Sequence, residues 1–115
     1  MNQLLDMQTI NGLKEILDDE FVELYVLFKS NSKLNIDKLI SAGKENDQVT
    51  IKQVAHTMKG SFGNLGLSAL FENMVNIENC LSNDEDADLD SLILNVEPLY
   101  HDTVQALIEN GILTE

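Results

Sequence analysis

The residues in this sequence best suited to chemistry are one histidine and the lysines and glycines close to it. His56 is followed by Lys59, Gly60 and Gly63, and it is preceded by Lys52. On an α-helix, which turns by about 100° per residue, these positions all fall within about 60° of His56. A neutral imidazole is a competent nucleophile near pH 7, and a phosphoryl group bound to it would bring negative charge for Lys59 to pair with.

The two glycines require an explanation, because glycine inside a helix costs roughly 0.5–1 kcal/mol relative to alanine. Close approach of a partner to the imidazole is a sufficient reason for Gly60 and Gly63. Lys52 and Gln53, one turn before the histidine, are weaker candidates for the same docking surface. If His56 were an ordinary surface histidine, the glycine pair and Lys59 would remain unexplained.

The histidine must be presented by a helix, because apolar residues recur along the chain at steps of three and four. We expect the motif helix to run from about residue 47 to residue 64, with Asp47 as its N-cap. At about 200° from Met58, His56 should point away from the core. The apolar seam that we expect to face the core consists of Ile51, Ala55, Met58, Phe62 and Leu65.

The same periodicity predicts the other helices. A short helix should cover residues 6–17, where the Asn11-Gly12 pair is a place for a break. One long or two abutting helices should follow over residues 18–43. A further helix is expected over residues 68–81, with apolar residues directed inward, namely Leu70, Phe71, Met74, Ile77 and Leu81.

An exposed polar linker should follow over residues 83–88, and a last helix over residues 89–108. Pro98 should kink this last helix or mark a restart. No strand signal is present in the sequence. The prediction is an all-α protein: one domain over residues 1–115 that forms an antiparallel four-helix bundle with a short additional N-terminal helix.

The charge of the chain excludes several classes of function. Twenty acidic residues, seven lysines and no arginine give a net charge of −13, and residues 60–115 contain eleven acids and no base. Such a chain is poorly suited to nucleic acids or to anionic membranes. The sequence also lacks an apolar run long enough to span a bilayer and a secretory signal. With a single cysteine, it is typical of a soluble cytoplasmic protein.

The motif resembles that of the histidine phosphotransfer (HPt) domains of bacterial multistep phosphorelays. The hallmark of that family is a histidine, then Lys-Gly at the third and fourth following positions, and later glycines. His56, Lys59, Gly60, Gly63 and Gly66 fit it, and the likeness extends over about residues 6–110. One departure is the bulky Phe62, where many relatives carry a small residue; we expect it to face the core.

The resemblance implies a mechanism and a set of partners. His56 would accept a phosphoryl group from an aspartyl phosphate of a receiver domain and pass it to another receiver, while Lys59 stabilises the group. The chain would need no cofactor and no ATP site of its own, since the receiver supplies its acidic pocket and Mg²⁺. A hybrid sensor histidine kinase would lie upstream, and the carrier would be a monomer. The chain is either a free-standing protein or an excised domain of such a kinase.

Other interpretations of the chemistry-bearing residues are weaker. A helical interaction module that carries no phosphate is the alternative from another class, and an ATP-dependent kinase would require a glycine-rich loop that the sequence lacks. His101 has no Lys-Gly after it, and Cys80 should be buried or half-buried. Two histidines and one cysteine do not make a zinc site. The acids from Asp86 to Glu97 match calcium-loop spacing, but Ser91 stands where glycine is required.

Overall fold

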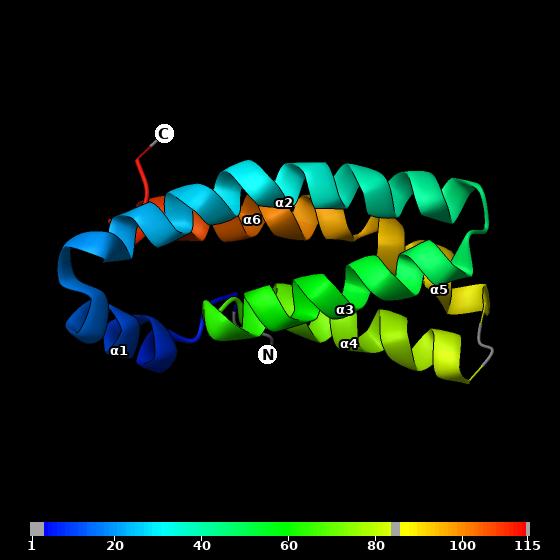
Figure 1. Ribbon diagram of the computed structural model, residues 1–115, viewed down its shortest axis with the longest axis horizontal. Coiled ribbons are helices and arrows are strands. Elements are labelled where there is room, and N and C mark those ends of the chain that lie inside the picture. Colours follow the sequence, from blue (N-terminus) through cyan, green and yellow to red (C-terminus); the bar gives the residue numbers. More distant parts are fainter. Residues whose placement is uncertain (1–3, 84–85, 115) are drawn as a thin grey trace.

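The computed structural model is an antiparallel bundle of four layers (Figure 1). Each layer is one long helix or a pair of successive helices. The structure describes residues 4–83 and 86–114, and within these ranges it contains helices and no strand. The elements are α1 (Met7–Leu17), a 3₁₀ turn (Asp18–Glu20), α2 (Phe21–Lys44), α3 (Gln48–Asn64), α4 (Ser68–Ser82), α5 (Asp86–Leu94) and α6 (Val96–Glu109). The predicted all-α fold, a four-helix bundle with a short N-terminal helix, is confirmed, with α5 and α6 together forming the fourth layer.

The motif helix α3 is fixed at both ends by local hydrogen bonds. The Asp47 carboxylate caps its start by accepting from the Thr50 amide at 3.2 Å and from the Thr50 hydroxyl at 2.6 Å. At its other end Gly66 adopts a φ of 72°, a left-handed conformation that favours glycine. The Leu67 amide donates back to the Phe62 carbonyl at 2.9 Å. This turn sets α4 antiparallel to α3.

Three local predictions are settled by the helix boundaries. The first helix runs unbroken through Asn11 and Gly12, and α2 is one continuous helix of 24 residues. Pro98 marks a restart: α5 ends at Leu94, and Pro98 is the third residue of α6, where a missing amide donor costs no intrahelical bond. The linker prediction was wrong for residues 86–88, which are helical in α5; residues 84–85 lie outside the described ranges.

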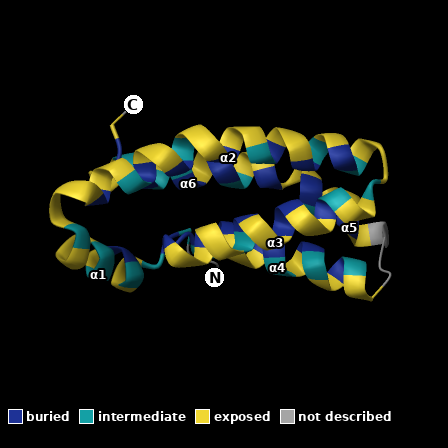
Figure 2. Ribbon diagram, viewed as in Figure 1, coloured by how far each residue is buried: buried dark blue, intermediate teal, exposed yellow. Residues whose placement is uncertain are grey.

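The core lies between the layers, along the buried faces of the helices (Figure 2). The Phe28 ring of α2 meets Phe62 of α3 at a centroid distance of 6.1 Å and Tyr100 of α6 at 5.8 Å. The predicted seam of α3 is buried throughout, and so is Cys80. The core therefore covers the face of α3 opposite His56.

One predicted core residue is not in the core. Phe71 was expected to face inward, but 39% of it is exposed. Its ring lies against α3 instead, as described below. Among the described residues, no helix is both long and apolar enough to cross a bilayer.

Candidate functional site

The His56 side chain projects from the outer face of α3, as the sequence predicted. Its neighbours Ala55 and Met58 are 0% and 2% exposed, whereas 73% of the imidazole is accessible. Burial of the apolar seam therefore orients the helix, and the orientation of the helix exposes the ring. Lys52 and Gln53, one turn earlier, are also exposed.

A carboxylate from the neighbouring helix completes the site, and sequence reasoning missed it. Glu78 of α4 contacts both functional side chains of α3. Its Oε1 lies 2.8 Å from the Lys59 Nζ, and its Oε2 lies 3.5 Å from the His56 Nδ1. The site is thus a cluster of His56, Lys59 and Glu78 across the α3–α4 seam, which we call the histidine cluster.

The electrostatics of the histidine cluster are dominated by the ion pair. The hydrogen bond from Lys59 lowers the pKa of Glu78, with a smaller contribution from His56 in the same direction, while partial burial opposes the shift. Glu78 is therefore a carboxylate at neutral pH. Because it faces Nδ1, it favours the tautomer with the proton on Nδ1, which leaves the lone pair on Nε2 available as a nucleophile.

The two motif glycines have different surroundings. A Cβ added at Gly60 would meet no heavy atom within 4 Å, so this position is open. A Cβ added at Gly63 would lie 3.1 Å from the Cδ1 and Cε1 atoms of Phe71, tighter than ordinary contact. Gly63 therefore makes room for the Phe71 ring, an internal reason for glycine that the sequence analysis did not foresee.

The remaining candidate residues lie away from this cluster. His101 is on α6, where its ring packs edge-on against Tyr100 at 5.9 Å. The segment of the calcium-loop alternative is helical from Asp86 to Leu94, so its backbone does not fold as such a loop. Among the residues that the structure describes, no three histidine, cysteine or acidic side chains gather in a way that could hold a metal ion.

Comparisons with known proteins agree with this fold. The model of the Hpt domain family matches residues 23–110. The crystal structure of histidine-containing phosphotransfer protein B (HptB) from Pseudomonas aeruginosa PAO1 superposes with a TM-score of 0.86 at 23% identity, covering 95% of this chain and 94% of that one. A search of curated proteins found no match.

The chain belongs to the Hpt domain family. Its function is therefore histidine phosphotransfer in a phosphorelay, the function of a phosphocarrier and not of a kinase. Proteins of this family interact with receiver domains and with kinases. The likeness to HptB, at its low identity, shows the shared fold.

Proposed function

We propose that His56 is the phospho-acceptor of this carrier, taking a phosphoryl group from a receiver aspartate and giving it to the aspartate of a second receiver. The observation that carries the proposal is the histidine cluster: an imidazole 73% accessible whose Nδ1 faces a carboxylate. An exposed ring held in one tautomer meets the requirement of a nucleophile that a partner must reach.

The transfer step uses the two nitrogens of the ring differently. The Nε2 lone pair attacks the phosphorus of the aspartyl phosphate, the bond from phosphorus to the acyl oxygen breaks, and the carboxylate leaves with that electron pair. The Nδ1 proton is directed at Glu78 during the attack, and the phosphorylated ring then releases this proton to solvent, so that phosphohistidine has a neutral ring. Attack by the aspartate of the second receiver on the same phosphorus reverses these changes and restores His56.

Lys59 and Glu78 act on the charge of the phosphoryl group. Lys59 Nζ sits 2.8 Å from the carboxylate in the resting state. When a dianionic phosphoryl group arrives on the ring, Lys59 is close enough to pair with it, while Glu78 repels it. The opposing charges keep phosphohistidine from becoming too stable for onward transfer.

The remaining parts of the reaction belong to the partners. In our proposal the receiver contributes the acidic pocket and its Mg²⁺, a hybrid sensor histidine kinase lies upstream, and this chain acts as a monomer without an ATP site. Gly60, Lys52 and Gln53 form the surface around the histidine that a receiver covers. The exposure of all three is consistent with that role.

The test is to mix the purified protein with phosphorylated receiver domains in the presence of Mg²⁺. We expect acid-labile, base-stable label on the wild type and on His101→Gln, and none on His56→Gln. Label on His56→Gln would assign the acceptor elsewhere. A folded wild type that takes no label from any receiver would favour the interaction-module alternative.

A further inference from the structure

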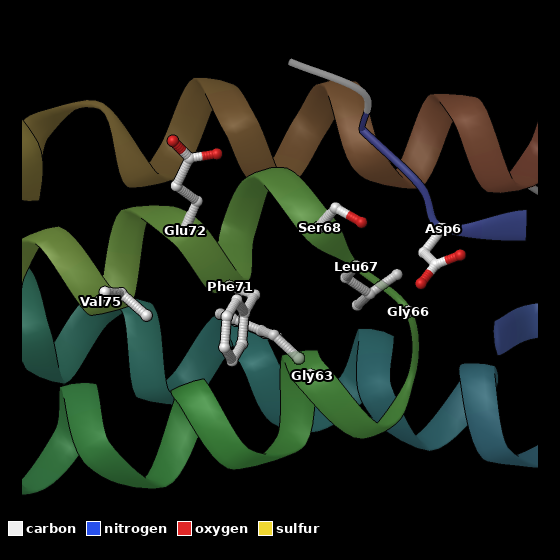
Figure 3. A pocket seen from close by; sticks show the side chains of 9 residues that line it. Asp6, Gly63, Gly66, Leu67, Ser68, Phe71, Glu72 and Val75 are labelled. Atoms are coloured by element: carbon white, nitrogen blue, oxygen red, sulfur yellow. The ribbon is translucent and has the colours of Figure 1, made fainter.

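A cavity of about 440 Å³ opens at the turn between α3 and α4, on the same seam as the histidine cluster. Figure 3 shows the Phe71 ring lying beside Gly63, with Leu67 and Gly66 at the turn and Asp6 approaching from the segment before α1. Val75 and Glu72 complete the α4 side of the lining. The lining is mostly apolar, and it is assembled from three separate parts of the chain.

The cavity exposes the aromatic ring that the core leaves out. Phe71 is 39% exposed, whereas the other five aromatic side chains are at most 8% exposed. Aromatic residues, phenylalanine among them, are enriched in the cores of protein interfaces, which are surrounded by a polar rim. The absence of a side chain at Gly63 is what allows this ring to lie on α3.

The cavity is close enough to His56 for one partner to cover both. Gly63 follows His56 by seven residues, or about 10 Å along the helix, and on nearly the same face. A standard interface covers about 800 Å² of each protein, equivalent to a disc of about 16 Å radius. Gly60, between the two, is open. An interface of this size that is centred on His56 therefore reaches the cavity.

The charge at the rim specifies what the partner should present. Asp6 and Glu72 are the ionisable residues of the lining, which contains no lysine. Asp6 also accepts a 2.8 Å hydrogen bond from the Thr9 hydroxyl, which holds its carboxylate in place. An apolar side chain with a lysine or arginine beside it is the complementary group.

Resting on the proposed function, we propose that this cavity is a docking pocket for the receiver domain, and that it takes an exposed apolar side chain flanked by a basic residue. The pocket supplies affinity at a distance from the reacting nitrogen. It should therefore affect how tightly a receiver binds and leave the chemical step unchanged.

The experiment measures the initial rate of transfer from a phosphorylated receiver at increasing concentrations of the carrier. Phe71→Ala and Glu72→Lys should each raise KM by roughly fivefold or more, the usual effect of losing an interface anchor. The maximal rate should stay within about twofold. Glu109→Lys, an equal change of charge on an exposed residue of α6, is the matched control and should behave as wild type.

Failure of this inference is distinct from failure of the proposed function. Unchanged KM in both Phe71→Ala and Glu72→Lys, with circular dichroism showing both folded and the wild type labelled normally, would overturn the docking pocket. So would a wild-type dimer in sedimentation that Phe71→Ala dissociates without changing KM, since the occupant would then be a second copy. A wild type that takes no label would instead refute the proposed function.

Discussion

The charges of the histidine cluster should set the equilibrium between phosphorylated receiver and phosphorylated carrier. With a neutral imidazole, the cluster carries +1 on Lys59 and −1 on Glu78. Glu78→Gln leaves +1, Lys59→Gln leaves −1, and the double variant restores zero. A phosphoryl group on Nε2 should prefer the more positive cluster, so the fraction of phosphohistidine should fall from Glu78→Gln, through wild type and double variant, to Lys59→Gln.

The size of the effect follows from the distances. Glu78 Oε2 lies 3.5 Å from Nδ1, which places it about 7 Å from a phosphorus on Nε2. At that distance the dianionic phosphoryl group and the Glu78 carboxylate repel each other by about 1 kcal/mol in a water-like dielectric. Glu78→Gln should therefore shift the equilibrium toward phosphohistidine by about fivefold. Lys59→Gln should shift it in the opposite direction by at least as much, because Lys59 pairs directly with the phosphoryl group. The shifts should shrink at high salt.

The assay starts from a labelled receiver at pH 8, where an ordinary imidazole is neutral, and reads the label on both proteins at equilibrium. His56→Gln gives the background. If the equilibrium of the double variant matched that of Lys59→Gln, the net charge of the cluster would not explain the effect of Lys59. Equal equilibria in all four proteins at low salt would refute the electrostatic argument.

Three further outcomes are expected. Gly60→Ala should stabilise the fold by about 0.5–1 kcal/mol in urea denaturation, because its Cβ meets nothing, yet slow transfer; a variant both more stable and equally fast would place the docking surface elsewhere. Tyr25→Phe removes a buried 2.8 Å hydrogen bond to the Leu65 carbonyl. The free energy of unfolding should therefore fall by about 1–2 kcal/mol, while the rate of transfer is unchanged. An unchanged urea midpoint would show that the bond contributes nothing to stability. Hydrogen bonds from Thr50 lower the pKa of Asp47 below 3.8, so the cap stabilises α3 above that pH and is lost as pH falls through the lowered value. The melting temperature of Asp47→Ala should thus be below that of wild type at pH 7, and this deficit should shrink as the pH falls below 3.8; a deficit that does not shrink would contradict a charged cap.

The parts of the fold that sequence could predict are those governed by local chemistry. The apolar seam of α3, its Asp47 cap and the restart at Pro98 follow from periodicity, capping and the missing amide of proline. The start of α5 could not be predicted in this way, because the acids at residues 86–88 are typical of both a linker and a first helical turn. Composition alone does not separate these two.

The parts that could not be predicted depend on how α3 and α4 sit against each other. Glu78 lies 22 positions after His56, and nothing in its own neighbourhood distinguishes it from the other acids of the chain. The register set by the Gly66 turn brings Glu78 opposite Lys59 and brings Phe71 opposite Gly63. The apolar periodicity of α4 predicted that Phe71 lies in the core. Instead its ring packs on α3, in the space left by the missing side chain of Gly63.

The segment that leads into α1 has a consequence for anyone who attaches something to this protein. The Asp6 amide donates to the Gly66 carbonyl at 2.7 Å, and the Ala69 amide donates to the Leu4 carbonyl at 3.5 Å. The chain therefore enters the bundle tied to the α3–α4 turn, whereas it leaves beside α2 and α6 (Figure 1). A fluorophore, affinity tag or fused domain on the N-terminal side would join the bundle at α4, the helix that carries Phe71 and Glu72. The same cargo joined after Leu113 would extend from beyond the end of α6 instead, and comparing the transfer rates of the two fusions would measure how much room a partner needs beside α4.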